Sequence, residues 1–331
     1  YNAIFTEVFG ATPQQLGDNY SKDTVSEWDS VHQLNIISLF EEIFDLMLDP
    51  EDIMACTSYN AGKEILAKNF DKYNNVEVWK QCFNQIDLTS LNSTDTEDKI
   101  GGMMERVNEF KAKYPEMPNV AAVCVYPALV PVTKATLETE GVNIAAVSAC
   151  FPSSQTFIEA KIAEVALTAA AGANEIDVVI SLGKFFSGFH TEVYEELQEI
   201  KDACHGAHLK VILESGLMHN TKEIKQASLL AMAAGADFIK TSTGKTERSA
   251  TLEAAYVMCQ AIKEYYEKTG IKVGFKPAGG ISTTKEAVEY YTIVRTVLGE
   301  EWMTNELFRF GASRLANNLL TSIYGTEVKY F

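Results

Sequence analysis

Short apolar runs alternate with longer amphipathic stretches from residue 76 to the end of the chain. The short runs are bounded by Gly or Pro, which is typical of buried parallel strands. The longer stretches repeat their apolar positions at helical spacing. We expect strands at residues 83–88, 120–126, 144–148, 175–180, 209–214, 238–241, 273–276 and 307–310. Helices are expected between them, for example at residues 156–171, 192–204, 221–234 and 252–269.

Eight strand–helix units in about 255 residues match a TIM (β/α)8 barrel in number and length. Gly172, Gly235 and Gly270 follow three of the expected helices, at positions where glycine ends a helix favourably. A doubly wound sheet is the alternative, but no G-x-G-x-x-G motif follows the first strand. The predicted fold class of this part is therefore α/β, with a TIM barrel as its architecture.

The first fifth of the chain has a different pattern and is expected to form a small all-α bundle. A short helix is expected at residues 2–9, and further short helices between residues 50 and 70. The longest amphipathic stretch lies between them, and Asp29 or Ser30 fits its N-cap. Its apolar positions are Leu34, Ile36, Ile37, Leu39, Phe40 and Ile43.

Charge also separates the two parts. Residues 1–72 hold 13 acidic residues and four lysines, and the whole chain has a net charge of −17. We therefore expect two domains, a helical domain at 1–72 and a barrel domain at 73–331, joined by a polar linker at 71–75. Such an acidic chain argues against a nucleic-acid partner, because nucleic-acid-binding proteins are usually basic.

Several features bear on the location of the protein. No run of about 18 apolar residues is present, so no membrane partner is expected. The N-terminus lacks the basic-then-apolar pattern of a signal peptide, although Tyr1 suggests that earlier residues are missing. The six cysteines form no C-x-x-C pair, which predicts a cytoplasmic location. His205 and His208 have the spacing of a metal pair but no third ligand nearby, and no metal site is expected.

The candidate chemistry begins with two lysines. Lys240 and Lys276 end the expected sixth and seventh strands, and glycine-bearing loops follow both. Adjacent parallel strands lie about 4.8 Å apart, so inward lysines there would share one pocket. Burial and a neighbouring cation both make an amine less basic, and a neutral amine can attack a carbonyl group to form a Schiff base. The pattern predicts imine chemistry on a small phosphorylated carbonyl compound, with the loops offering backbone N–H groups to the phosphate.

Two acids complete the candidate site. Alternation along the fourth strand places Asp177 on the same face as Val179, and Asp87 has a similar place in the first strand. An inward acid needs a cation or a polar site around it, and the two lysines would supply that partner. The alternative is that Asp177 serves only as a structural ion-pair partner of a lysine.

A resemblance to a known enzyme family extends this interpretation of the barrel part. Residues 79 to 325 resemble deoxyribose-phosphate aldolase, a class I aldolase. The matching segments are IDLTSLN (86–92), AAVCVYPALVP (121–131), EIDVVI (175–180), GADFIKTSTGK (235–245), GFKPAGGI (274–281) and FRFGAS (308–313). The resemblance implies that Lys240 forms the Schiff base, that Lys276 lowers its pKa and that Asp177 joins a proton relay. No cofactor is implied for the aldolase.

The resemblance also implies how substrate is held. The expected substrate-binding residues are Asp87, Thr89, Cys124, Gly244, Lys245, Gly279, Gly280, Gly311 and Ser313. Two positions depart from the family pattern: Ser282 stands where relatives often have an arginine, and Arg314 where some have a second serine. The phosphate site would thus have exchanged one cation for another. Many relatives end in a tyrosine that reaches the active site, whereas Tyr330 is penultimate here and a flexible tail is the alternative.

Residues 1–72 resemble an acyl carrier protein. The resemblance rests on Asp29-Ser30 at the start of the long helix and on the acidic residues Glu41, Glu42 and Asp45 that follow. It implies a 4′-phosphopantetheine arm on Ser30, and partner enzymes that recognise a carrier. Val31 departs from the usual leucine. The alternatives are a Ser30 that only caps the helix, and a carrier unit that is inactive or was joined to the barrel by engineering.

The resemblance of the barrel part thus implies a class I aldolase that reversibly cleaves 2-deoxy-D-ribose 5-phosphate to D-glyceraldehyde 3-phosphate and acetaldehyde. Its expected partners are small phosphorylated sugars and aldehydes. A homodimer through the barrel is expected from the family. Two alternatives stay open: another imine-forming aldolase of transaldolase type, and an inactive barrel that acts as a scaffold beside the carrier domain.

Overall fold

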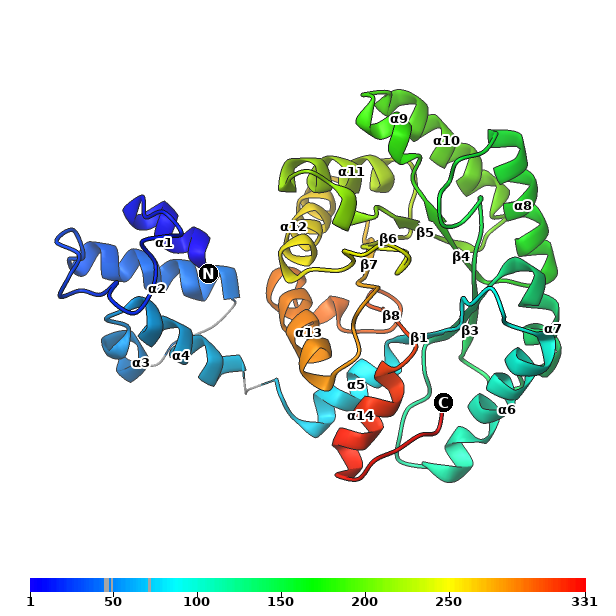
Figure 1. Cartoon of the computed structure of the whole chain (residues 1–331), viewed down its shortest axis with the longest axis horizontal. Helices are drawn as coiled ribbons and strands as arrows, with labels where there is room; N and C mark the ends of the chain where they lie inside the picture. Colours follow the sequence, from blue (N-terminus) through cyan, green and yellow to red (C-terminus); the bar gives the residue numbers. More distant parts are fainter. Residues whose placement is uncertain (45–47, 49, 71–72) are drawn as a thin grey trace. The chain divides into compact units, whose positions relative to one another are not determined.

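The computed structural model describes residues 1–44, 48, 50–70 and 73–331. The chain forms two compact units, Tyr1–Asn75 and Val76–Phe331, which are described separately here (Figure 1). Asp45, which is part of the acidic pattern, and residues 71 and 72 of the expected linker lie outside the described residues. None of the described helices combines the length and the apolar character that a membrane span needs.

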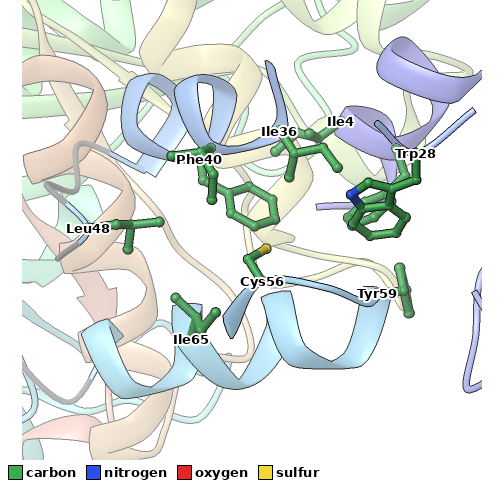
Figure 2. Close-up of a cluster of buried hydrophobic side chains, with 10 residues drawn as sticks. Ile4, Trp28, Ile36, Phe40, Leu48, Cys56, Tyr59 and Ile65 are labelled. Atoms are coloured by element: carbon green, nitrogen blue, oxygen red, sulfur yellow. The ribbon is translucent and has the colours of Figure 1, made fainter. Parts of the chain in front are cut away.

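The N-terminal unit consists of four described helices: α1 (Asn2–Phe9), α2 (Ser30–Phe44), α3 (Pro50–Ala55) and α4 (Tyr59–Phe70). Figure 2 shows side chains from several segments of this unit meeting in one apolar core. The core includes Phe5 and Phe40, which are fully buried, and Trp28, which is 3% exposed. Helix α1 ends at Gly10, whose φ of 66° is the left-handed conformation that glycine adopts without strain.

The second unit contains eight parallel strands. They are β1 (Ile86–Thr89), β2 (Ala122–Val125), β3 (Asn143–Val147), β4 (Glu175–Val179), β5 (His208–Ile212), β6 (Phe238–Lys240), β7 (Gly274–Lys276) and β8 (Phe310–Ala312). From β1 to β7 each strand pairs with the next one in the chain, and β1 also pairs with β8. Single bridges from Phe275 to Phe308 and from Ala278 to Gly311 join the remaining edge. The strands therefore form a nearly closed barrel, consistent with a TIM barrel.

Helices surround these strands on the outside (Figure 1). They are α5 (Val76–Asn84), α6 (Glu97–Lys113), α7 (Val130–Thr136), α8 (Ile158–Ala171), α9 (Leu182–Phe186), α10 (His190–Ala203), α11 (Thr221–Ala233), α12 (Leu252–Thr269), α13 (Thr284–Leu298) and α14 (Leu315–Tyr324). Gly172 and Gly270 cap α8 and α12 in the left-handed conformation, as expected from their positions.

The bounds of all eight expected strands differ from those in the structure, by up to three residues, and the first and last strands begin furthest from their expected starts. Phe83 and Asn84 form the end of α5, so the first strand begins only at Ile86. The last strand begins at Phe310 rather than at residue 307, because the segment before it pairs with β7 instead. Phe275 donates to the carbonyl of Leu307, and Arg309 donates to the carbonyl of Phe275. Residues 307–312 therefore pass from β7 to β1 and join the two edges of the barrel.

Candidate active site

Lys240 and Lys276 face each other at the carboxyl ends of β6 and β7. The two residues are partners in the strand register, and their side chains are 4% and 0% exposed. Both ammonium groups bind the same oxygen, Oδ2 of Asp177, at 2.7 Å and 2.8 Å. The expected lysine pair therefore shares one buried pocket, with the β4 carboxylate between the two nitrogens.

The second carboxylate oxygen of Asp177 has different surroundings. Oδ1 is buried and has no hydrogen-bond partner among the residues that the structure describes. Buried acceptors are almost always paired, so an unpaired one beside two lysines is suited to a ligand hydroxyl or a transferred proton. Burial alone would raise the pKa of Asp177, but Lys240 and Lys276 together bring it below its usual range. The carboxylate is thus held in its ionised form.

The two lysines differ in basicity. Burial lowers the pKa of Lys240, and the positive charge of Lys276 lowers it further. The carboxylate of Asp177 acts in the opposite direction but does not outweigh these effects, so the pKa of Lys240 is lowered. Burial also acts against the charge of Lys276, but Asp177 and Asp87 outweigh it and raise the pKa of Lys276. Asp87 Oδ2 lies 2.5 Å from Lys276 Nζ. The expectation that both lysines lose basicity is therefore wrong for Lys276, because it has two carboxylate partners.

Thr89 and Cys124 lie beside this cluster without direct hydrogen bonds to the lysines among the described contacts. The Thr89 hydroxyl donates to the carbonyl of Asp87 at 2.7 Å. Thr89 and Ser313 line one cavity of about 170 Å³ near the carboxyl ends of β1 and β8. Cys124 is fully buried on β2, and burial raises the pKa of its thiol to about 11, so it remains protonated.

The loops after β6 and β7 approach each other through glycines. Gly244 and Gly279 both have positive φ, and a Cβ added to Gly279 would lie 3.2 Å from the Gly244 Cα and 2.6 Å from the Ser249 Cβ. Any larger residue at Gly279 would therefore separate the loops. Gly280 also has positive φ but lies in open space. These backbones can approach an anion closely.

A buried acid holds the β6 loop in place. Glu214 follows β5 and accepts from the backbone N–H of Thr243 at 3.1 Å and from its hydroxyl at 2.5 Å. Lys245 then extends to the loop after β1, where its ammonium group donates to the carbonyl of Leu91 at 2.5 Å. The expected phosphate-binding Lys245 thus already bridges two loops at the carboxyl ends of the strands.

The two departures from the family pattern have different surroundings. Ser282 donates to Glu286, which also accepts from Thr283 in a capping box at the start of α13. Glu286 therefore already satisfies the N–H groups of this helix end. Arg314 is exposed just after Ser313; its backbone carbonyl accepts from Asn318, but no described residue forms a hydrogen bond or ion pair with its guanidinium group. Arg314 is thus the cation that is free to bind an anion beside β8.

Gly311 has a packing role in this structure. A Cβ there would lie 2.7 Å from the Ala278 Cβ and 3.2 Å from the Lys276 Cε. The contact with Ala278 is shorter than real Cβ atoms show and the one with Lys276 is tight, so a larger residue would press on both neighbours. The expected substrate-binding residue Gly311 therefore also shapes the wall behind the lysine pair.

The C-terminal tail is fixed by hydrogen bonds, and Phe331 borders the cavity that Thr89 and Ser313 line. The backbone N–H groups of Tyr330 and Phe331 both donate to Asn317 Oδ1, and the Tyr330 hydroxyl donates to the carbonyl of Arg106 at 2.8 Å. The tail is thus packed on α6 and α14 rather than flexible.

Three buried charged residues of the barrel interior were missed by the sequence reasoning: Glu175, Lys210 and Arg309. Each is at most 1% exposed. Alternation along β4 gives a signal for Glu175, because it lies two residues before Asp177 on the same face. For Lys210 and Arg309 the signal is a single charge inside an apolar run. Their partners come from distant strands and cannot be read from the run itself.

The remaining candidate residues lie elsewhere. His205 and His208 border a cavity of about 560 Å³ at the amino end of the barrel, and no group of three metal-binding side chains gathers among the described residues.

Ser30 is exposed at the first residue of α2. Asp29 is the N-cap, since its Oδ1 accepts from the backbone N–H groups of Val31 and His32 at 2.9 Å each. The interpretation of Ser30 as a mere helix cap is therefore wrong.

Comparison with known proteins agrees with this geometry. Residues 83–298 match the model of the DeoC/LacD family aldolases. The chain is 41% identical over 254 residues to human deoxyribose-phosphate aldolase and 42% identical to the mouse enzyme, in each case covering 72% of this chain and 78% of the relative.

Solved structures show the same fold. An aldolase called QR15 is 27% identical, with a TM-score of 0.61 over 73% of this chain and 96% of that chain. Deoxyribose phosphate aldolase from Aeropyrum pernix, described as tetrameric, is 24% identical, with a TM-score of 0.61 over 78% of this chain and 97% of that chain. The chain is a class I aldolase and belongs to the DeoC/LacD family.

Proposed function

We propose that the barrel unit catalyses the reversible cleavage of 2-deoxy-D-ribose 5-phosphate to D-glyceraldehyde 3-phosphate and acetaldehyde. The proposal is supported by the names of the human and mouse relatives. The observation that carries it is the arrangement of Lys240 and Lys276 on one oxygen of Asp177, with the other oxygen unpaired among the described residues.

Lys240 is the nucleophile in this proposal. Its neutral amine attacks C1 of the open-chain sugar, and loss of water from the adduct leaves an iminium ion. The iminium accepts the electron pair of the C2–C3 bond as that bond breaks, while the proton of the C3 hydroxyl passes to Asp177. Glyceraldehyde 3-phosphate leaves with C3 as its new aldehyde carbon. The remaining enamine takes a proton at C2, and water releases acetaldehyde and restores the amine.

Lys276 assists without reacting. Its ammonium group binds both Asp177 and Asp87, so it holds the carboxylate in position and takes part with Asp177 and water in the proton relay. The sugar phosphate would bind at the glycine-bearing loops after β6, β7 and β8. Gly244, Lys245, Gly279 and Gly280 would contact it from one side, and Ser313 with Arg314 from the other.

A substrate panel tests this proposal against a transaldolase-type activity. The full chain should condense acetaldehyde with glyceraldehyde 3-phosphate to the deoxysugar phosphate, and it should show no transfer of a dihydroxyacetone unit. Lys240→Ala should lower turnover to background, whereas Lys201→Ala, at the opposite end of the barrel, should leave it unchanged. Dihydroxyacetone transfer without use of acetaldehyde would favour the alternative, and a lack of turnover with either substrate would favour a scaffold.

For the N-terminal unit we propose a carrier function, with 4′-phosphopantetheine attached to Ser30. The supporting observation is that Asp29 performs the capping, which leaves the exposed Ser30 hydroxyl free of hydrogen bonds to the residues that the structure describes. Coexpression with a matching transferase followed by intact-mass measurement tests this. The wild type should gain the mass of one phosphopantetheine arm and Ser30→Ala should not. An unmodified wild type under conditions that modify a known carrier would refute the attachment.

We further propose that the protein acts in the cytoplasm as a homodimer through the barrel. All six cysteines are free thiols, which suits a reducing compartment. Light scattering of the full chain, and of the barrel unit alone, tests the dimer. A monomer at micromolar concentration in both measurements would contradict it.

A further inference from the structure

The barrel interior holds a second layer of charge beneath the lysine pair. We call Glu175, Lys210 and Arg309 the lower layer. Arg309 donates to Glu175 at 2.8 Å and 3.1 Å, and Lys210 binds Glu175 as well. The three side chains lie almost entirely out of solvent, from β4, β5 and the segment before β8. None of the contacts described for them reaches Lys240 directly.

Asp87 connects this layer to the site above it. One of its oxygens accepts from Arg309 at 2.7 Å, and the other lies 2.8 Å from Lys210 and 2.5 Å from Lys276. Lys276 in turn shares Asp177 with Lys240. An unbroken series of ion pairs therefore leads from Arg309 to Lys240 across the interior of the barrel.

The charges of this interior come close to cancelling. Three carboxylates, Asp87, Glu175 and Asp177, face three cations, Lys210, Lys276 and Arg309. Lys240 is the seventh ionisable group, so the interior is electrically neutral only when its amine carries no proton. An unbalanced charge in a buried, poorly polarisable region is strongly disfavoured.

The other elements around Lys240 do not alter this balance of charges. The thiol of Cys124 on β2 stays protonated, and β3 contributes no titratable side chain. The carboxylate of Glu214 is bound by Thr243 in the loop beyond the strand ends, and Lys245 of the same loop carries the opposite charge. These two charges offset each other.

Five of the six flanking groups are held in their charged forms by their partners, and the sixth, Lys210, is ion-paired with both Asp87 and Glu175. Burial would raise the pKa of Asp87 and of Glu175, but Lys210 and the other cations lower both. Burial acts against the charge of Arg309, and Asp87 and Glu175 raise its pKa in turn. Lys240 is therefore the group whose protonation state changes when the charge of the interior changes.

We propose that Glu175, Lys210 and Arg309 are positioning residues that keep Lys240 unprotonated by balancing the charge of the barrel interior. This inference rests on the proposed function, in which Lys240 is the nucleophile. The lower layer holds Asp87 and, through it, Lys276, while contributing one net positive charge to the interior. It acts on the reaction only through Lys240.

The test uses paired charge changes in the full chain. Arg309→Met leaves the interior with an extra negative charge, Glu175→Gln leaves it with an extra positive charge, and the double variant restores neutrality. Borohydride trapping with acetaldehyde is followed against pH, and the midpoint of the acid limb at Lys240 is measured. We expect the midpoint to rise by about one pH unit in Arg309→Met and to fall by about as much in Glu175→Gln, since an unpaired interior charge acts over this range.

The double variant and Arg309→Lys are the controls. Both variants keep the net interior charge of the wild type. Both midpoints should therefore lie within a few tenths of a pH unit of the wild-type midpoint, even where packing and the rate of trapping change. If Arg309→Met does not fold, Glu175→Gln and the double variant still give different expectations, a lower midpoint in the first and the wild-type midpoint in the second. Unchanged midpoints in the folded charge-changing variants, with wild-type trapping on Lys240, would overturn the inference and leave the proposed function intact. Absence of any adduct on wild-type Lys240 would instead overturn both.

Discussion

At the scale of single residues, the proposed reaction depends on a difference between two lysines one strand apart. Lys240 has Asp177 as its ion-pair partner, whereas Lys276 has both Asp177 and Asp87. The second carboxylate makes Lys276 a permanent cation beside an amine that burial has already made less basic. Charge placement rather than lysine burial alone therefore assigns the roles.

Lys276→Met tests this assignment. Removing the neighbouring cation leaves Lys240 beside an unneutralised Asp177, so the pKa of Lys240 rises and its neutral form is reached only at higher pH. We expect the acid limb of the pH–kcat profile to move to higher pH and kcat to fall about 100-fold or more because the relay is lost. Lys201→Met should leave both quantities unchanged. An acid limb that stays in place would show that Lys276 does not tune Lys240.

Arg314 is the residue on which phosphate recognition can be tested. Its exposed guanidinium follows Ser313, and no described residue pairs with it. Arg314→Ala should raise KM for the sugar phosphate about 10-fold or more, because a charge-assisted bond to phosphate is lost, with little change in kcat. KM for unphosphorylated 2-deoxyribose should be unaffected in Arg314→Ala. Lys268→Ala is the control, in which KM for either sugar should be unchanged. An equal loss with both sugars would mean that Arg314 supports the fold rather than the phosphate.

At the scale of elements, close approaches through glycine shape the barrel interior. Gly274 is the first residue of β7 and pairs with Phe238 of β6. A Cβ added to Gly274 would lie 2.3 Å from the Phe238 ring. That ring lies below Lys240 on β6, and the cationic groups of Lys210 and Arg309 lie 5.3 Å and 5.7 Å from its centre. A larger residue in β7 would therefore displace both an aromatic side chain and two buried cations.

Gly274→Ala should accordingly destabilise the barrel by about 1–3 kcal/mol, the usual range for an overpacked core. Urea unfolding of the barrel unit gives the measurement. Gly101→Ala is the matched control, because Gly101 lies in α6 with open space around it and alanine favours a helix by about 1 kcal/mol. A Gly274→Ala variant as stable as the wild type would mean that the strands can move apart at no cost.

Much of the element order could be predicted from the alternation of apolar runs. All eight strands lie at or beside their expected positions, because a buried parallel strand needs a continuous apolar run. The largest errors lie at residues 83–85 and 307–309, and the other bounds differ by at most two residues. Phe83 faces a core whether it is helical or extended, and Leu307 and Phe308 pair with β7 rather than β1. Apolar character alone cannot distinguish these cases.

The site was predictable to the same extent. Strand ends and side-chain alternation are visible in sequence, so Lys240, Lys276 and Asp177 could be placed on one face in advance. The pairing of Arg309 with Glu175 could not, since the two residues are 134 positions apart. Which strands face each other across a barrel depends on its closure, and closure follows from contacts that no local pattern contains.

At the scale of the whole molecule, the chain consists of two compact units with separate cores. The charges that surround Lys240 all lie between Asp87 and Arg309, within the second unit. We therefore expect the chemistry to need no residue of the first unit.

The fragment of residues 76–331 should retain kcat and KM within about twofold of the full chain. Steady-state assays of both proteins check this, with the Lys240→Ala fragment as the control for background turnover. A folded fragment without activity would show that the first unit contributes to catalysis.

The most direct test of the central claim is the position of the Schiff base. The full chain is incubated with acetaldehyde, reduced with borohydride, digested and analysed by mass spectrometry. The account predicts one reduced adduct, on the peptide that contains Lys240. An adduct on Lys276 or Lys210 with Lys240 unmodified would contradict it, as would an adduct that persists in Lys240→Ala.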